Sequence, residues 1–278
     1  MSPSNRGLPI FFFHTGNPPY LKHILEQAHK KNNHVVLLGD ETNKNLRGEH
    51  TMFTEYLYDI ETFKRSYRHM STNSQQFEVI CFIRWFVLRN FMVRNNIEAC
   101  FYADSDIMIY GDLTKEWSKF KENNCAFMMP DEQTPYSWSA SGHNSFWTQE
   151  ALIEFCDFLN DAYCTETTFT KLADKWNFHI QNNKPGGICD MTLFWLYYQD
   201  KGGENIGILS KVSEGSTFDD NIVSSENRYK DEYRMKEGLK ELDFREDVPY
   251  GYNLREDQWV RFNTLHYSGA GTKHLIGK

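Results

Sequence analysis

The chain has 278 residues, of which 40% are hydrophobic and 24% charged. These proportions are typical of a folded globular protein and exclude a disordered or low-complexity chain. Lys and Arg total 30 against 38 Asp and Glu, which gives a net charge of −8. Because neutralised phosphates supply most nucleic-acid affinity, we expect no nucleic-acid partner. The same acidity argues against attachment to an anionic membrane surface.

Cysteine usage and the apolar stretches bear on the compartment. The six cysteines form no Cys-x-x-Cys pair and no Cys/His cluster with the spacing of a zinc site. Most lie in apolar runs, as buried free thiols do in a reducing compartment. The amino terminus has no signal pattern, and Arg84 and Arg89 interrupt the longest apolar stretch. We therefore expect a soluble, cytoplasmic protein with no integral membrane segment.

Strand and helix patterns alternate over the first two hundred residues. Continuous apolar runs, which favour strands covered on both faces, occur at 9–13, 35–38, 99–102 and 125–129. Helical spacing occurs at 20–31, 77–95, 150–163 and 190–199. This alternation predicts an α/β fold with a mostly parallel central sheet flanked by helices.

Three further segments complete this outline. Residues 52–58 are expected to hold one more strand and the start of a helix, and 107–110 to continue the strand at 99–102. Residues 213–258 are crowded with charge and contain few apolar runs, so we expect short antiparallel strands, a helix and long loops there. Such a segment has no second core of its own, and the chain has no internal repeats, which predicts a single domain over residues 1–278.

Asp104 and Asp106 are the central chemical feature. The apolar strand that begins at Ala99 delivers these two carboxylates to its carboxyl end, where open α/β sheets bind their ligands. Two hard oxygen ligands, completed by phosphate oxygens, suit Mg²⁺ or Mn²⁺. An Asp-x-Asp pair alone is unspecific, and a solvated turn after a strand is the other interpretation of it.

Arg84 adds to this feature because of its position on the preceding helix. The apolar stripe of that helix runs through Phe77, Cys81, Arg84, Leu88 and Phe91, so Arg84 lies on the face that packs against the sheet. A guanidinium there needs anionic partners, because an unpaired buried charge is very costly. The aspartates or a bound diphosphate would serve, and a purely structural ion pair is the alternative.

A third feature lies near the carboxyl terminus. In the segment from Leu265 to Lys273, apolar sequence leads up to His266. Small flexible residues and then a lysine follow it. Glycine at position 269 lets backbone approach a phosphate closely, and Lys273 could neutralise it. His266 could complete a metal shell with the two aspartates; a hydrogen-bonded core histidine is the alternative.

Together these residues resemble a known family. The Arg84 helix, the segment Tyr102–Ile107, the Gly111-Asp112-Leu113 that follows and the late His-Gly-Lys segment occur in the same order in nucleotide-sugar glycosyltransferases of the GT-A fold. The chain is most similar to a divergent member of family 8, the group that contains glycogenin and bacterial lipopolysaccharide galactosyltransferases. Its late motif has one extra residue before Lys273. The resemblance implies a Rossmann-like, GT-A-like domain with a nucleotide-binding half over 1–112 and a sugar and acceptor half over 113–278.

The resemblance also implies roles for individual residues. A Mn²⁺ or Mg²⁺ ion would be held by Asp104, Asp106 and His266. The nucleotide-sugar donor would be contacted by Thr15, Gly16, Asp40, Arg84, Asp104, Ser105, Gly269 and Lys273. Asp190 would face the transferred sugar as the catalytic residue, with Ser141–Asn144 lying near it. The implied activity is transfer of a sugar from a nucleotide-sugar, by family a UDP-sugar, to a carbohydrate, lipid-linked or protein acceptor.

The departures from the family leave alternatives open. Family 8 members often have Gln directly after the acidic residue at the sugar site, whereas Met191 follows Asp190, so a Gln-assisted retaining mechanism does not transfer. The family resemblance still favours retention. A haloacid-dehalogenase phosphotransferase also uses Asp-x-Asp, but after its first strand. A non-catalytic nucleotide-sugar or glycan-binding protein on a degenerate transferase fold is the more serious rival. The polar segment 213–258 is the expected acceptor-facing or lid region.

Overall fold

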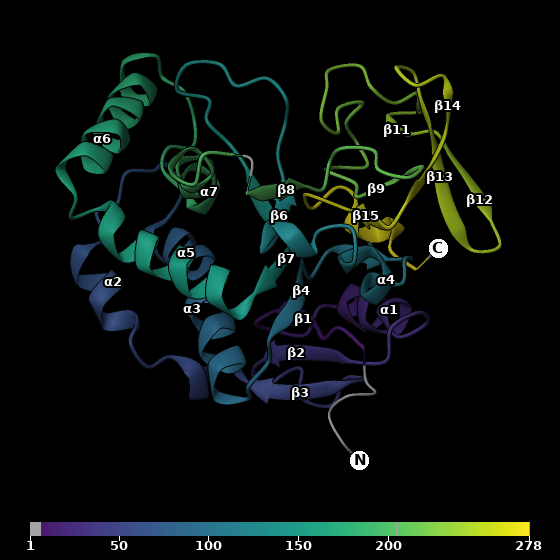
Figure 1. Ribbon diagram of the computed structural model, residues 1–278, viewed down its shortest axis with the longest axis horizontal. Helices are drawn as coiled ribbons and strands as arrows, with labels where there is room; N and C mark the ends of the chain where they lie inside the picture. Colours follow the sequence, from purple (N-terminus) through teal and green to yellow (C-terminus); the bar gives the residue numbers. More distant parts are fainter. Residues whose placement is uncertain (1–6, 204, 278) are drawn as a thin grey trace.

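A seven-stranded sheet runs through the centre of the computed structural model, which describes residues 7–203 and 205–277 (Figure 1). Its strand order is β3-β2-β1-β4-β7-β6-β8. The strands are β1 (Ile10–Phe13), β2 (Val35–Gly39), β3 (Glu49–Met52), β4 (Ala99–Asp104), β6 (Cys125–Met128), β7 (Ser141–Thr148) and β8 (Ile206–Ile208). Strand β7 is antiparallel to both of its neighbours, and every other pair in this sheet is parallel. The expected α/β fold with a mostly parallel sheet is confirmed.

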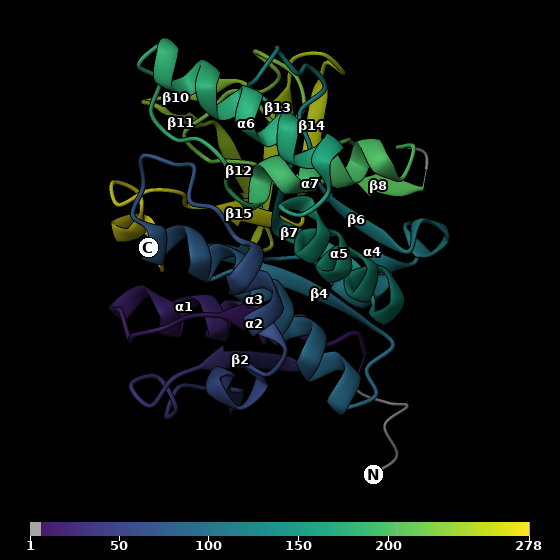
Figure 2. The same ribbon diagram turned by 90° about the vertical axis from the view of Figure 1, so that its left-hand side faces the viewer.

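Helices cover both faces of the sheet, as Figures 1 and 2 show. Helices α1 (Pro19–Ala28) and α4 (Leu113–Trp117) lie on one face. The other face carries α2 (Ile60–Ser66), α3 (Gln75–Arg94), α5 (Gln149–Ala162) and α7 (Asp190–Asp200), with α6 (Glu166–Gln181) beside α7. Short 3₁₀ helices in the described part of the chain are η2 (Phe53–Tyr56), η3 (Lys121–Asn123) and η4 (Lys273–Leu275).

The core forms because successive strand residues point to opposite faces. Phe11 of β1 packs into the cluster beneath α3 and α5, whereas Ile10 and Phe12 pack into the cluster beneath α1. Strand β2 divides in the same way, with Val36 on the first side and Val35 on the second. A strand buried on both faces must be apolar at every position, which is why these segments are continuous apolar runs.

Three smaller sheets extend from the central one. A four-stranded sheet has the order β12-β13-β14-β9, and β10 pairs with β11 and β5 with β15. Their bounds are β5 (Ile107–Ile109), β9 (Ser216–Thr217), β10 (Met235–Lys236), β11 (Leu239–Lys240), β12 (Leu242–Arg245), β13 (Val248–Asn253), β14 (Gln258–Phe262) and β15 (Thr264–His266). Strand β5 therefore leaves the central sheet, where a simple continuation of β4 was expected. The prediction of a helix within 213–258 is wrong, because this segment is described throughout and contains strands, turns and loops but no helix.

Several element boundaries differ from the sequence prediction. Phe77 is 56% exposed, because it lies in the first turn of α3, before the helix reaches its packed stretch. Helix α1 ends at Ala28, so the basic residues 29–31 follow the helix instead of forming its last turn. Strands β7 and β8 and helices α4 and α6 were not expected. Segment 52–58 does hold the end of a strand and a short helix, β3 and η2.

Most of the cysteines are buried or partly buried free thiols. Cys100, Cys125 and Cys156 are buried free thiols, whereas Cys164 is exposed because it lies in the turn after α5. Among the described residues, none of the helices combines the length and apolar character that crossing a bilayer requires. Strands from both sides of residue 112 share the central sheet, since β6, β7 and β8 pair with β4 or with each other.

Candidate functional site

The carboxyl ends of β1, β2 and β4 meet at one edge of the sheet. Phe13 pairs with Leu38 on one side and with Asp104 on the other, so the segments that follow these strands begin side by side. Strand β15 then pairs antiparallel with β5, which sets His266 opposite Ile107. The structure thus gathers the aspartate pair, His266 and the loops after β1 and β2 at one edge, as the sequence predicted.

Arg84 links two carboxylates beneath this edge. Its guanidinium donates to Asp104 Oδ1 at 2.5 Å and to Asp190 Oδ2 at 2.6 Å. Its side chain is 14% exposed and that of Asp190 5%. Trp85 Nε1 also donates to Asp190 Oδ2, at 3.1 Å, and the Tyr102 hydroxyl donates to Asp104 Oδ1 at 3.0 Å. Arg84 therefore holds both carboxylates in fixed positions, and removing it would leave Asp190 buried without its counter-charge.

Asp106 has two cationic neighbours from the end of the chain. The Lys273 ammonium donates to Asp106 Oδ2, and His266 Nε2 lies 3.5 Å from Asp106 Oδ1. Burial alone would raise the pKa of Asp106, but hydrogen bonds and charge from His266 and Lys273 outweigh it and lower that pKa. Burial likewise disfavours charged His266, yet Asp106 raises the pKa of His266 to about 9. These three groups form a compact charged cluster.

The orientation of His266 is fixed from behind. Its Nδ1–H donates to the Asp220 carbonyl at 2.5 Å, which leaves Nε2 directed at Asp106. The backbone N–H of His266 donates to Asp219 Oδ2 at 3.0 Å, and the Asp219 carboxylate also pairs with Lys240 at 2.6 Å. A histidine whose second nitrogen is held by a carbonyl has the arrangement usual for metal-binding histidines.

The loops after β1 and β2 are tied to each other. The Gly16 N–H donates to Asp40 Oδ2 at 2.7 Å, and Thr42 donates to Asp40 Oδ1 through its N–H at 2.9 Å and its hydroxyl at 2.5 Å. Burial acts to raise the pKa of Asp40, but these hydrogen bonds prevail and lower it. A third contact joins His14 Nδ1 to the Ser105 hydroxyl at 2.6 Å. Thr15 is exposed at this edge.

Two glycines leave open space at the same edge. Gly16 has φ +90° and Gly269 has φ +82°, which are backbone conformations that other residues rarely adopt. Apart from the glycine and its two chain neighbours, no heavy atom of the described residues lies within 4 Å of the position that a Cβ would take at Gly16 or Gly269. Backbone at both positions is therefore accessible to a ligand, as close approach to a diphosphate requires.

The residues present can be tested against a divalent cation. Asp106 supplies hard oxygen and His266 an imidazole nitrogen already oriented by a carbonyl, and this donor set fits Mn²⁺ or Mg²⁺. Asp104, in contrast, is directed toward Arg84. Within residues 7–203 and 205–277, no three His, Cys, Asp or Glu side chains are placed together so as to hold a metal ion. The structure therefore brings two of the three expected ligands together.

Residues of β7 lie next to the charged cluster. The sequence predicted only that Ser141–Asn144 lie near the sugar. His143 stacks on His266, with ring centroids 4.4 Å apart and an interplanar angle of 28°. Asn144 is fully buried, and its amide donates to the Asp219 carbonyl at 3.1 Å. Sequence reasoning missed the supporting roles of His143, Asp219 and Lys240, because these contacts join segments far apart in the chain.

Comparisons with known proteins complete the description. The chain matches no protein-family model, and the search of curated proteins finds no relative. Three solved structures of similar shape are mouse xyloside xylosyltransferase 1, the bifunctional glycosyltransferase WbbM and the galactosyltransferase LgtC in complex with donor and acceptor sugar analogues. Their identities are 12%, 10% and 15%, and their TM-scores 0.47, 0.44 and 0.40. The matches cover 73%, 97% and 72% of this chain and 84%, 47% and 73% of the other chains. Because all three TM-scores lie below 0.5, the function proposed below rests on the residues of this chain.

Proposed function

We propose that the chain is a metal-dependent glycosyltransferase that moves a sugar from a nucleotide-sugar, of the UDP type, to a carbohydrate, lipid-linked or protein acceptor with retention of configuration. The observation that carries this proposal is the meeting of Asp106, His266 and Lys273 beside Asp104 at the carboxyl edge of parallel strands. A ligand with a diphosphate and a bound cation matches that mixture of carboxylates, imidazole and ammonium.

In this proposal the chain's residues position the donor and its leaving group. Asp106 and His266, joined by Asp104 through Oδ2 while its Oδ1 accepts from Arg84, would hold Mn²⁺ or Mg²⁺, which would stabilise the negative charge on the departing diphosphate. Lys273, now on Asp106, would turn its ammonium to the phosphates, which open backbone at Gly269 lets approach closely.

The remaining residues act on the nucleoside and the sugar. Thr15, Gly16 and Asp40 would face the nucleoside from the ends of β1 and β2, and Ser105 would lie beside them. Arg84 would keep Asp104 and Asp190 in place. Asp190 would stabilise the positive charge that develops on the sugar, or orient the acceptor hydroxyl.

One observation favours a second candidate, a binding protein that retains the donor without consuming it. Asp190 is 5% exposed and both Arg84 and Trp85 donate to the same oxygen, Oδ2. A carboxylate so enclosed is already neutralised, which weakens it as a catalytic group. Donor turnover separates the two candidates, because a binding protein would leave the nucleotide-sugar intact.

The experiment is an assay of UDP release from a panel of UDP-sugars with Mn²⁺ present or removed by chelation. We expect Mn²⁺-dependent release by the natural chain, and a loss of at least about a hundredfold in Asp106→Asn, because that variant lacks a metal ligand. Asp243→Asn is the matched control, because it removes an aspartate on β12 whose side chain is 45% exposed and pairs only with surface Arg245 among the described residues. Unchanged release in Asp106→Asn would contradict the metal site, and binding without any release would favour the second candidate.

A further inference from the structure

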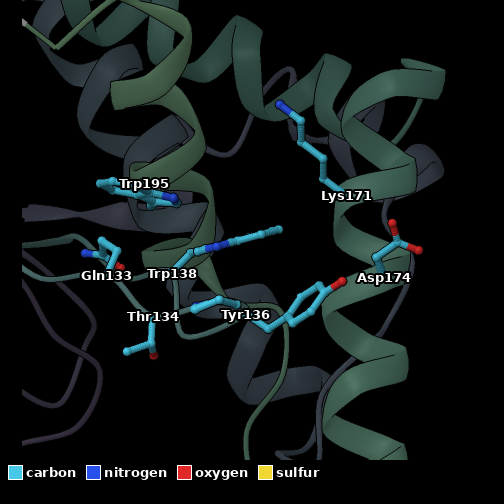
Figure 3. A pocket seen from close by; sticks show the side chains of 8 residues that line it. Gln133, Thr134, Tyr136, Trp138, Lys171, Asp174 and Trp195 are labelled. Atoms are coloured by element: carbon cyan, nitrogen blue, oxygen red, sulfur yellow. The ribbon is translucent and has the colours of Figure 1, made fainter.

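A cavity of about 430 Å³ lies outside the charged cluster, between helices α6 and α7. Figure 3 shows its side chains, with Trp195 on α7, Lys171 and Asp174 on α6, and Tyr136 and Trp138 from the segment between β6 and β7. Ligand-binding cavities commonly measure roughly 300–1,000 Å³ and combine aromatic walls with a few polar groups. The size and lining of this cavity match that description.

Its aromatic rings are supported from behind. Tyr136 stacks on Phe178 of α6 at a centroid distance of 4.8 Å and an interplanar angle of 20°. Trp195 stacks on Tyr198 at 5.7 Å and 19°. Tyr136 also lies 5.5 Å from Trp138. Stacking on a neighbouring ring fixes the orientation of Tyr136 and of Trp195.

The segment that carries Tyr136 and Trp138 is held in its shape. The Gln133 amide makes two hydrogen bonds with the Ser139 backbone, at 2.7 and 2.9 Å. The buried Lys175 ammonium donates to the Trp138 carbonyl at 2.9 Å. Tyr136 has φ +63°, which is unfavourable for a side chain of its size and persists only where the surroundings impose it. The cavity wall is therefore preorganised.

The polar groups at the rim have no partners within the described part of the chain. Lys171 and Asp174 are exposed and lie three residues apart on α6, so their side chains share one face of the helix. The side chains of Lys171 and Asp174 make no hydrogen bond or ion pair with a described residue, and both residues line the cavity. The carboxylate and the ammonium are suited to bind hydroxyl groups. The aromatic rings beside them are suited to pack against an apolar ring face.

The cavity is joined to the charged cluster through α7. Asp190 begins this helix and Trp195 lies five residues later, about 7.5 Å along the axis. The Ala140 N–H donates to the Met191 carbonyl at 3.1 Å, which fixes the aromatic segment to the first turn of the same helix. Helix α7 thus carries Asp190 at its first residue and a wall residue of the cavity, Trp195, further along.

We propose that this cavity binds a pyranose ring of a glycan acceptor, so that the acceptor class of the proposed transferase is carbohydrate. The inference rests on the proposed function. The C–H face of the ring lies on Trp138, and its hydroxyls bond with Asp174 and Lys171. An extended peptide would instead pair its backbone with the edge of a strand, and none of the residues given for the cavity lining belongs to a strand.

The test measures binding of methyl glycosides of glucose, galactose, mannose, xylose and N-acetylglucosamine, without nucleotide, by saturation-transfer NMR. We expect the natural chain to bind at least one of them and Trp138→Ala to bind it at least about tenfold more weakly. Trp138→Phe keeps an aromatic face and should retain most of the affinity. Asp174→Asn, which removes an exposed charge and no packing, should also weaken binding. Phe244→Ala, an exposed aromatic on β12, is the control.

Two results would overturn the inference. One is failure of every glycoside to bind the natural chain, and the other is unchanged binding in both Trp138→Ala and Asp174→Asn. Binding of peptides in place of glycosides at Trp138 would reassign the cavity to a polypeptide. Nucleotide binding, followed on the same variants by thermal unfolding with UDP and Mn²⁺, should not change in Trp138→Ala. If the natural chain binds a glycoside but no UDP with Mn²⁺, the proposed function is refuted and the glycoside site remains.

Discussion

At the scale of single residues, Asp106 is the carboxylate that a cation, His266 and Lys273 would all contact. Lys273 and His266 already neutralise this carboxylate, and the pKa of Asp106 is lowered accordingly. A cation that binds Asp106 must displace at least part of this contact. The released Lys273 ammonium then becomes available for phosphate, so metal and donor are expected to bind together.

A buried pair behind His266 gives a prediction at the same scale. Lys240 and Asp219 are fully buried and 2.6 Å apart, and Asp219 also accepts the His266 N–H. Lys240→Met leaves Asp219 buried without its counter-charge, which should lower the free energy of unfolding by about 3–5 kcal/mol. Urea unfolding measures this value.

The double variant Asp219→Asn with Lys240→Met is the control for that prediction. It removes both charges but keeps an oxygen that can accept the His266 N–H, so it should be more stable than Lys240→Met alone. A Lys240→Met protein within about 0.5 kcal/mol of the natural chain would show that the pair contributes little, as surface substitutions do.

The sequence singled out the charged residues that meet in the cluster, but not the residues that support them. Asp104, Asp106, His266 and Lys273 stand out in the sequence because they follow apolar strands or small flexible residues. Asp219 and Lys240 lie in a charged segment where nearly every residue is polar. Only the packing of that segment on β15 shows that this one pair is buried.

At the scale of elements, continuous apolar runs predicted strands reliably. Strands β1, β2, β4 and β6 are buried on both faces, so their sequences carry a strong signal. Helix α6 buries only Leu172 and Lys175, so its apolar pattern is weak and it was missed. Strand β5 was mistaken for a continuation of β4 because its partner, β15, lies at the other end of the chain.

Helix α6 supplies a prediction about pH. Burial lowers the pKa of Lys175 to about 8, and among the described residues its ammonium donates to two neutral oxygens, those of Trp138 and Thr192. The unfolded lysine keeps its proton up to an ordinary pKa near 10.5, so raising the pH from 8 to 10.5 removes a cost from the folded state alone. Over that range the stability of the natural chain should therefore rise relative to Lys175→Met, by roughly 3 kcal/mol.

Urea unfolding of both proteins at the two ends of this range gives the comparison. Taking the difference between them cancels the titration of tyrosines and cysteines that both proteins contain. Lys171→Met, which removes an exposed lysine from the same helix, is the matched control. A constant difference between the natural chain and Lys175→Met would show that Lys175 remains charged in the folded protein.

At the scale of the whole molecule, one sheet connects the charged cluster, proposed to bind the donor, to the aromatic cavity, proposed to bind the acceptor. Strands β1, β2 and β4 end at the charged cluster, and β7 and β6 lead from the same sheet to the segment that carries Trp138. Helix α7 starts at Asp190 and carries Trp195, so it reaches from the cluster to the aromatic cavity. This arrangement holds the two proposed binding sites at a fixed separation.

The most direct measurement is thermal unfolding of the natural chain with UDP, GDP, CDP or ADP, each with and without Mn²⁺. A ligand at a hundred times its dissociation constant should stabilise the folded state by about 2.7 kcal/mol, which is readily measured as a higher melting temperature. We predict that UDP raises the melting temperature, and that it does so only when Mn²⁺ is present. The absence of a shift with every nucleotide, in the presence of Mn²⁺, would contradict a metal-dependent nucleotide-sugar site at Asp106 and His266.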